Sequence, residues 1–347
     1  MNTAWHSFLL AHGATIGQTQ ALSFGDTARN ATAQGTVIVD LSHLGLITVE
    51  GTDAAVFLQG QLSNDLSLVT ETHSQLSAWC SAKGRVLTLM RVFKHTDTYY
   101  LQLPRDILQE TLKRLRMYVL RSHVILNDAS DTLIGIGLSG TDAPALLTRV
   151  LDTTPPSVND VLHGGDIHSS FTLLGLPGTQ PRFEIIANIE TAQALWRRCA
   201  DTATPGGGEA WSLLDIRAGL PAIHSATQDM FIPQMINLDL IGAVSFTKGC
   251  YPGQEIVART HHLGTLKRRM YYVQAQALQA LEPGAALYSA TSGQGIGHVV
   301  AAARGAATEI ELLAVLPVTD AVDKHIRLHA SEGPLLHFAK LPYPIPE

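Results

Sequence analysis

Short apolar runs alternate with amphipathic helices over residues 37–218, and this grouping limits the fold more than any other feature. The runs are rich in Val, Ile, Leu and Phe, which is typical of buried strands. Predicted strands are 37–42, 44–49, 78–80, 86–93, 99–103, 124–127, 133–138, 167–174 and 183–187. Apolar residues at helical spacing predict helices over 53–61, 106–118, 142–151, 190–201 and 209–218. Because such groups recur in both parts of this stretch, the pattern predicts two similar α+β units.

The sequence pattern changes after Lys267, where Pro-Gly and Gly-rich turns separate short apolar runs. This predicts an all-β C-terminal domain, either a small barrel or a sandwich. The glycines within 293–297 resemble a dinucleotide-binding fingerprint only weakly, because a strand follows them instead of a helix, and they predict a hairpin. The segment 204–208 lacks the Gly-Lys-Ser/Thr ending of a phosphate loop, so we expect a flexible connector there.

The composition excludes several classes of protein. With 347 residues the chain is long enough for two or three domains, and 46% hydrophobic against 16% charged residues excludes wholesale disorder. A net charge of −6 without a long basic run gives no electrostatic case for direct nucleic-acid binding. No stretch approaches the roughly 20 apolar residues that span a bilayer, and the N-terminus does not read as a signal peptide. The 3 widely spaced cysteines fit a reducing compartment, so we expect a cytoplasmic protein without a disulfide framework or a membrane partner.

The densest chemical signal is the segment 247–259, Thr-Lys-Gly-Cys-Tyr-Pro-Gly-Gln-Glu-Ile-Val-Ala-Arg. Its two glycines and its proline indicate a tight turn that can approach a ligand closely. Cys250 is the candidate catalytic thiol, because the ammonium of Lys248 would favour the thiolate if the two side chains converge. The alternative is that Cys250 only fills a tight turn.

The same segment carries candidate binding residues. Tyr251 offers a stacking face with a polar tip. Gln254, Glu255 and Arg259 can read a polar heterocycle by paired hydrogen bonds. If the segment is helical, Glu255 and Arg259 stand at i and i+4 and can instead pair with each other. The 15 histidines are scattered and none sits in a known metal motif, so we expect no metal site.

The run Lys-Gly-Cys-Tyr-x-Gly-Gln-Glu at 248–255 resembles the signature of the YgfZ family, which is related to the T-protein of the glycine cleavage system. Similar pieces occur along most of the chain. They are 57–65, 83–85, 217–221, 231–235, 237–238 and 264–268. The signature is specific, whereas each of the other pieces would be weak alone.

The resemblance implies an α+β, T-protein-like arrangement of three domains around a central opening that binds tetrahydrofolate. Two ferredoxin-like α+β modules with antiparallel sheets and a C-terminal β-barrel would surround this opening. We expect residues 1–45 with 135–245 to form the first, discontinuous module, 46–134 the second, 246–265 the signature and its connection, and 266–347 the barrel. The resemblance further implies a monomer with iron–sulfur enzymes or cluster-assembly proteins as partners.

The chain departs from the T-protein where that enzyme carries acidic residues. Leu87 and Thr88 stand in place of an acidic pair, one member of which is essential for aminomethyl transfer, and neither can act as a comparable base. Arg217 replaces another folate-contacting acid, while Asp65 remains and could address the pterin ring or cap a turn. The side chains expected to bind folate are Asp65, Arg217, Lys248, Tyr251, Gln254, Glu255 and Arg259.

Three functions stay open at this stage. The first is a tetrahydrofolate-binding factor that supports the assembly or maintenance of iron–sulfur enzymes, and through them tRNA thiomethylation. The second is a folate-dependent one-carbon transferase or demethylase that acts on an unknown amine. The third is a thiol-dependent enzyme that uses Cys250 with His224 or His261 as base, which is the weakest because no sequence feature places a base nearby. Whether the chain is an enzyme is therefore left open.

Overall fold

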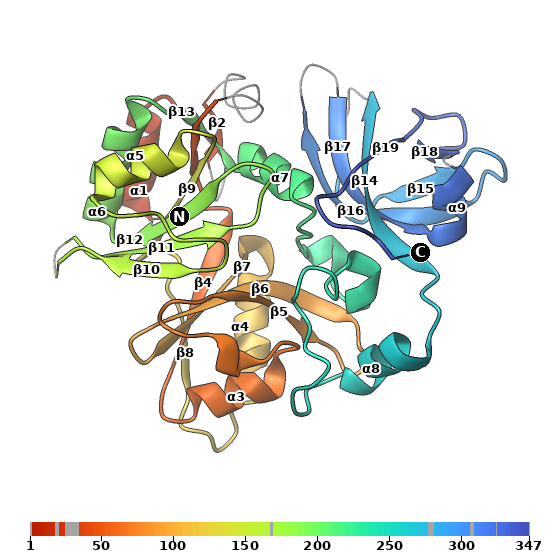
Figure 1. Ribbon diagram of the computed structural model, residues 1–347, viewed down its shortest axis with the longest axis horizontal. Helices are drawn as coiled ribbons and strands as arrows, with labels where there is room; N and C mark the ends of the chain where they lie inside the picture. The colour runs from red at the N-terminus through yellow and green to blue at the C-terminus, as the bar shows by residue number, and fades with distance from the viewer. Residues whose placement is uncertain are drawn as a thin grey trace. The chain divides into compact units, whose positions relative to one another are not determined.

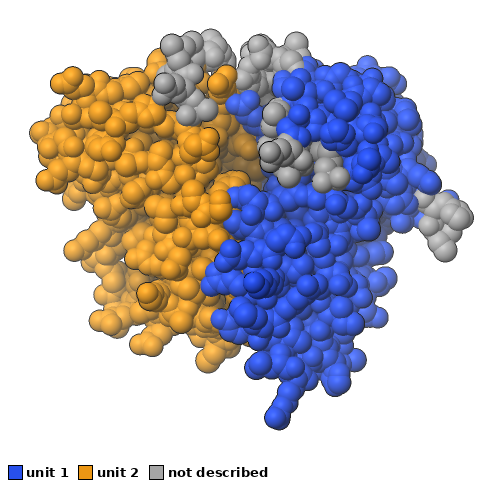
Figure 2. Space-filling model, turned by 180° about the vertical axis from the view of Figure 1, so that it is seen from behind, with its two compact units in different colours: residues 1–57, 66–75, 90–211 blue, residues 58–65, 76–89, 212–347 orange. Residues whose placement is uncertain are grey.

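The computed structural model describes residues 2–17, 21–24, 35–166, 169–276, 281–305, 309–323 and 325–346. Backbone contacts group the chain into two compact units, which Figure 2 shows in two colours. Unit 1 comprises residues 1–57, 66–75 and 90–211, and unit 2 comprises residues 58–65, 76–89 and 212–347. Helices occur together with largely antiparallel sheets, which confirms the predicted α+β class.

A six-stranded sheet in unit 1 has the strand order β10-β11-β12-β9-β3-β13. Its strands are β3 (Val37–Asp40), β9 (Ile134–Ser139), β10 (Val161–Gly164), β11 (Phe171–Leu176), β12 (Arg182–Ala187) and β13 (Thr204–Gly206). The accompanying elements are α1 (Thr3–Ala11), β1 (Thr15–Ile16), β2 (Ala21–Ser23), α5 (Ala143–Leu151) and α6 (Ile189–Ala200). Trp5, Leu147 and Trp196 bring α1, α5 and α6 into one apolar core with this sheet. Burial of one face of α5 and α6 explains why these two helices are amphipathic in sequence.

The segment 204–206 is a strand, so the predicted flexible connector is wrong there. β13 pairs in parallel with β3, with Thr204 opposite Val37 and Gly206 opposite Val39. Pro205 is tolerated because β13 is an edge strand, where a missing backbone N–H need not break a ladder. The predicted strand 167–174 includes residues 167 and 168, which lie outside the described residues.

A five-stranded sheet has the order β5-β6-β7-β4-β8. Its strands are β4 (Leu44–Glu50), β5 (Gln75–Cys80), β6 (Val86–His95), β7 (Thr98–Pro104) and β8 (Ile125–Asp128). The helical elements of this stretch are α3 (Ala54–Gln61), η1 (Leu66–Leu68), η2 (Arg105–Ile107) and α4 (Leu108–Met117). Burial of Leu108, Leu112 and Leu115 on one face of α4 agrees with the helical spacing predicted from the sequence. The chain passes from unit 2 into unit 1 within β6.

The C-terminal sheet of unit 2, blue in Figure 1, has the order β18-β15-β16-β17-β14-β19. Its strands are β14 (Arg268–Gln276), β15 (Ala286–Ser289), β16 (Gly295–Arg304), β17 (Glu309–Pro317), β18 (Ile326–Leu328) and β19 (His337–Ala339). The β15–β16 pairing confirms the hairpin predicted at 293–297. The short helix α9 (Val318–Asp323) follows β17, so the region is not wholly β as predicted.

The segment that leads to the C-terminal sheet of unit 2 contains short helices joined by turns. It contains α7 (Gly208–Arg217), which begins in unit 1, and then η3 (Ser225–Thr227), η4 (Pro233–Ile236) and α8 (Gln254–Leu263). Leu213, Ile236 and Val257 from this segment share a core with Val86 and Met270. The signature segment is therefore fixed at the start of a helix whose inner face is buried. None of the helices in the described ranges is both long and apolar enough to cross a bilayer.

Candidate functional site

Two glycines hold the turn of the signature segment against a neighbouring hairpin turn. Gly253 precedes α8 with φ +80°, and Gly84 lies in the turn between β5 and β6 with φ +67°. A Cβ atom on Gly253 would lie 2.4 Å from the carbonyl oxygen of Ser81 and 2.6 Å from Cα of Gly84. Only glycine allows two backbones to approach this closely in the left-handed conformation. Gly249, in contrast, has open space on the side where a Cβ would stand, because no atom lies within 4 Å of that position.

Lys248 is an anchor for the signature segment. Its side chain is buried, and its Nζ donates hydrogen bonds to the carbonyl oxygens of Gln59 at 2.6 Å, Leu62 at 2.6 Å and Asn64 at 3.1 Å. These carbonyls lie at and just beyond the C-terminal end of α3, where a helix leaves acceptors without an internal partner. An ammonium has three N–H groups, so all of its donors are used. Burial lowers the pKa of Lys248 to about 8, and the carboxylate of Asp65 opposes this shift.

Tyr251 and Gln254 also hold the turn together. The ring of Tyr251 is buried and its centroid lies 5.3 Å from Nζ of Lys248, within the range of a cation–π contact. Burial raises the pKa of Tyr251 above its ordinary value, so the phenol stays neutral. Nε2 of Gln254 lies 3.4 Å from the carbonyl oxygen of Lys248. Tyr251 thus packs under the segment instead of presenting an open stacking face.

Cys250, Glu255 and Arg259 are exposed on the same segment. No ion pair joins Glu255 to Arg259 within the described ranges, although they are one turn apart on α8. Within those ranges Cys250 has no hydrogen bond to a histidine, and His261 stacks on Phe246 with ring centroids 3.7 Å apart. The exposed thiol is therefore presented by a turn whose neighbours on both sides are anchored.

Asp65 follows directly on the carbonyls that Lys248 binds. Its carboxylate accepts a hydrogen bond from Nε2 of Gln59 at 3.1 Å, and its backbone N–H donates to Oδ1 of Asn64 at 3.0 Å. Asn64 is fixed in turn, because its side-chain amide donates to the carbonyl oxygens of Leu76 and Gly242. The half-buried carboxylate of Asp65 and the ammonium of Lys248 thus belong to one polar cluster at the end of α3.

Arg217 belongs to a different cluster. It ends α7, and its guanidinium forms a fork with Glu311, with Nη2 at 2.6 Å from Oε1 and Nε at 3.0 Å from Oε2. The hydroxyl of Tyr272 also donates to the Glu311 carboxylate, which is only 1% exposed. Glu311 was not singled out in the sequence, because a lone acid in a strand carries no signal for a partner so far away along the chain. The guanidinium of Arg217 is engaged with a buried carboxylate of this same chain.

Leu87 and Thr88 lie on β6 and are both buried. The hydroxyl of Thr88 lies 3.4 Å from the carbonyl oxygen of Leu89, and the backbone carbonyl of Leu87 accepts from Nε2 of Gln228. Neither position carries a group that can hold negative charge near neutral pH. Both positions, at which the resemblance to the T-protein implied acids in that enzyme, are occupied by core residues of the strand in this chain.

One thiol per folded chain is expected to react with Ellman's reagent at about pH 8, and all 3 in guanidinium chloride. Cys80 is 2% exposed and Cys199 is 0% exposed. Burial raises the pKa of Cys80 to about 12 and that of Cys199 to about 11, so neither forms an accessible thiolate. In Cys250→Ala the reaction of the folded chain should disappear. Rapid labelling of a second thiol in the native wild type would contradict this assignment.

Comparison with known proteins defines the class. The family model of the GCVT N-terminal domain matches residues 19–165. The crystal structure of the glycine cleavage system aminomethyltransferase T from Bartonella henselae superimposes with a TM-score of 0.77 at 18% identity, over 99% of this chain and 97% of that one. The protein therefore has the fold of the T-protein, as the sequence predicted.

Curated relatives narrow this class to one family. The tRNA-modifying protein YgfZ of Yersinia enterocolitica is 31% identical over 312 residues, which cover 89% of this chain and 93% of that protein. The protein of the same name from Hamiltonella defensa is 34% identical over 251 residues, covering 72% and 73%. The chain belongs to the YgfZ family.

Proposed function

We propose that the protein binds a tetrahydrofolate and supports the assembly or maintenance of iron–sulfur enzymes in the cytoplasm, and that it promotes tRNA modification only through them. The observation that carries this proposal is a T-protein fold that keeps Asp65 and an exposed Cys250 but has Leu87 and Thr88 in place of acids. A folate scaffold without the base for aminomethyl transfer is suited to binding and delivery. The proposed partners are iron–sulfur enzymes or cluster-assembly proteins, with the chain as a monomer.

The residues of the signature segment divide into two roles under this proposal. Lys248, Tyr251 and Gln254 build the turn, because their polar groups and rings contact one another or the end of α3. Cys250, Glu255 and Arg259 are left exposed toward a ligand or a partner. A carboxylate such as Asp65 is the acceptor that the ring N–H and amino groups of a pterin require, so the residues present fit a folate.

Folate binding is tested by calorimetric titration of the full chain with 5-formyltetrahydrofolate, a stable reduced folate. We expect saturable binding at one site, and a loss of about tenfold or more in Asp65→Asn, because one charge-assisted hydrogen bond is weakened. Glu332→Gln is the matched control, since it removes one exposed acid of the same unit and should bind like the wild type. No binding by a wild type that is folded by circular dichroism would overturn the proposal.

The thiol is tested in the same titration. Cys250→Ala should bind the folate as the wild type does, because the Cys250 side chain is exposed and the turn is held by its neighbours. The variant should nevertheless fail to support the activity of an iron–sulfur client in cells. If the variant instead restores the client fully, Cys250 has no role in the function proposed here.

A folate-dependent one-carbon transferase remains the second candidate, and the T-protein fold is the observation that favours it. It requires a base or a charge-stabilising carboxylate other than the missing pair. Incubation of the folate-loaded chain with candidate N-methyl amines and detection of a one-carbon folate product would distinguish it from the first. The absence of product at saturating folate would exclude the transferase and leave the iron–sulfur assembly role as the proposed function.

A further inference from the structure

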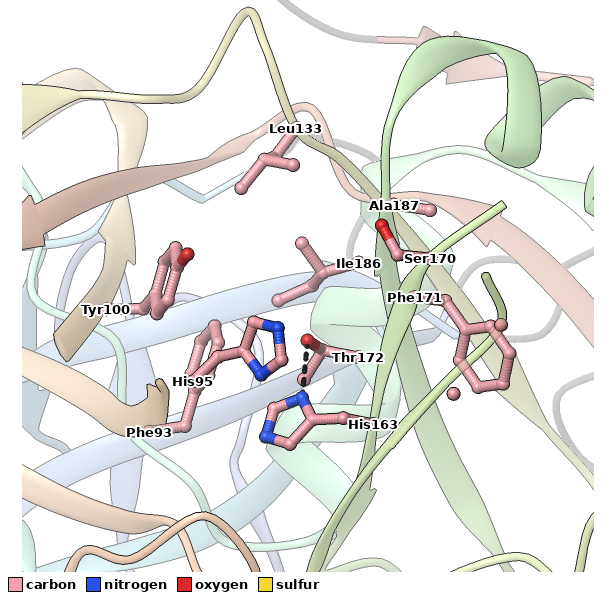
Figure 3. Close-up of a pocket in the computed structure, with 12 residues that line it drawn as sticks. Phe93, His95, Tyr100, Leu133, His163, Ser170, Phe171, Thr172, Ile186 and Ala187 are labelled. Atoms are coloured by element: carbon pink, nitrogen blue, oxygen red, sulfur yellow. Dashed lines mark hydrogen bonds between the residues drawn. The ribbon is translucent and has the colours of Figure 1, made fainter. Parts of the chain in front are cut away.

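Three side chains that are distant in the sequence meet in unit 1, and none of them is among the candidate site residues discussed so far. They are Glu71, in the turn before β5, His95, at the end of β6, and His163, in β10. One ligand atom from each, two imidazole nitrogens and a carboxylate oxygen, lies within 4.8 Å of the others. Figure 3 shows the rings of His95 and His163 beside each other, and their centroids are 4.1 Å apart. Sequence analysis missed this cluster because no two of its members share a motif.

The separations suit ligands of one ion better than partners of one hydrogen bond. Oε2 of Glu71 lies 3.6 Å from Nε2 of His163 and 3.8 Å from Nδ1 of His95. These distances exceed the roughly 2.7–3.2 Å between donor nitrogen and acceptor oxygen in an N–H···O hydrogen bond. Zinc bonds of about 2.0–2.1 Å in a tetrahedron place neighbouring ligand atoms about 3.4 Å apart. Movements of a few tenths of an ångström would therefore bring both pairs to the edges of a coordination polyhedron.

The individual nitrogen atoms support the same arrangement. Nδ1 of His95 is buried and has no hydrogen-bond partner among the described residues, which is costly for a polar atom unless an ion or water satisfies it. Nδ1 of His163 lies 3.0 Å from the hydroxyl of Thr172. If Nδ1 carries the proton and donates it to Thr172, Nε2 keeps its lone pair for a metal, as is usual for ligating histidines. In the metal-free chain the tautomer is the opposite one. The carbonyl oxygen of Lys94 can only accept and lies 3.0 Å from Nε2, so Nε2–H donates to it, and metal binding must replace this hydrogen bond and move the proton to Nδ1.

A cavity of about 370 Å³ adjoins the two histidines. Figure 3 shows that both imidazoles line it together with aromatic and small aliphatic side chains from the neighbouring strands. Three protein ligands beside an open cavity are typical of zinc sites that keep one position for water or substrate. The ammonium of Lys94 lies 4.0 Å from Oε1 of Glu71, and Oε2 accepts a hydrogen bond from the backbone N–H of Thr96 at 3.1 Å. A carboxylate oxygen has two lone pairs, so Oε2 can keep this bond and still face an ion.

We propose that Glu71, His95 and His163 bind a divalent transition-metal ion of the zinc class, with one coordination position open to the adjoining cavity. Two imidazoles and one carboxylate form a donor set that such ions prefer over calcium or magnesium. The three ligands belong to unit 1, whereas the signature segment and Asp65 belong to unit 2, so the metal site can be tested without folate.

The test is a calorimetric titration of the full, chelator-treated chain with Zn²⁺, followed by metal analysis after dialysis. We expect one tightly bound Zn²⁺ per chain. Affinity should fall by about 100-fold in His95→Ala and His163→Ala and by about tenfold or more in Glu71→Gln, since losing a direct ligand costs at least as much as losing the group that orients it. His95→Ala is the most informative variant, because Nδ1 makes no hydrogen bond whose loss would unfold the chain.

Two matched controls separate this site from other zinc-binding groups. His73→Ala removes a histidine of the same unit that pairs with Asp160, at 3.3 Å, and Cys250→Ala removes the exposed thiol. Both should keep the tight Zn²⁺, and thermal melts should show all variants folded. The proposal is overturned if the wild type retains no stoichiometric Zn²⁺, or if His95→Ala and His163→Ala retain it as the wild type does.

Discussion

Replacing Arg217 with methionine is expected to lower the free energy of unfolding by about 3–5 kcal/mol, the usual cost of removing one partner of a buried ion pair. The carboxylate of Glu311 would keep the hydroxyl of Tyr272 but lose both N–H groups of the guanidinium. At 1% exposure it has no water to replace them. Denaturation by urea, followed by circular dichroism, measures the change.

Two further variants separate the lost ion pair from other effects. Arg259→Met removes an exposed arginine of the same unit and should change the stability by less than about 0.5 kcal/mol. The double variant Arg217→Met with Glu311→Gln removes the buried charge while the side-chain oxygen can still accept from Tyr272, so it should regain much of the loss. A single variant as stable as the wild type would show that the pair contributes little. The question of folate contact at position 217 can then be answered in the double variant, which should remain folded.

Replacing Gly253 with alanine is expected to cost roughly 3 kcal/mol, because it combines a left-handed backbone with an overpacked contact. The new methyl group would stand 2.4 Å from the carbonyl oxygen of Ser81 and 2.7 Å from the backbone nitrogen of Gly84. Neither backbone atom can turn aside as a flexible side chain would, so the two turns must separate. The same urea titration measures the loss.

Gly249→Ala is the matched control for this prediction. The two glycines belong to the same signature, but a Cβ on Gly249 meets no atom within 4 Å, and its φ is outside the left-handed range. Its stability should stay within about 0.5 kcal/mol of the wild type. Equal effects of the two substitutions would contradict the role given to the paired turns. If Gly249→Ala impairs folate binding or client activation without loss of stability, this glycine serves the ligand or the partner.

Local patterns in the sequence sufficed for most of the secondary structure. The helices α4 and α6 and the strand β12 follow from spacing and β-branched content, because each buries one face or both in a core. The strand at 204–206 could not be predicted, since Pro205 and Gly206 are of types depleted in strands, and the segment forms its ladder at the edge of the sheet beside β3. Tertiary pairing decided the conformation of that segment.

The candidate site was predictable only in part. The sequence singled out the 248–255 run as a unit, and the structure shows why the run is specific: Lys248 and Gly253 are each fitted to backbone atoms from 59–64 and 81–84. The sequence did not reveal that the ammonium of Lys248 donates to three backbone carbonyls. Every residue has a backbone carbonyl, so the identity of the side chains does not mark which ones accept. Contacts between distant segments, such as Arg217 with Glu311, were hidden for the same reason.

The route of the chain between the two units has a consequence for how the protein is made. Residues 58–65 and 76–89 belong to unit 2, yet a ribosome releases them long before the rest of that unit at 212–347. Until Lys248 emerges, the carbonyls at the end of α3 lack the cation that binds them in the finished fold. The thiol of Cys250 thus acquires its final surroundings late in synthesis. Its exposure on the anchored turn requires that the early segment 58–65 and the late segment 247–259 are already in contact.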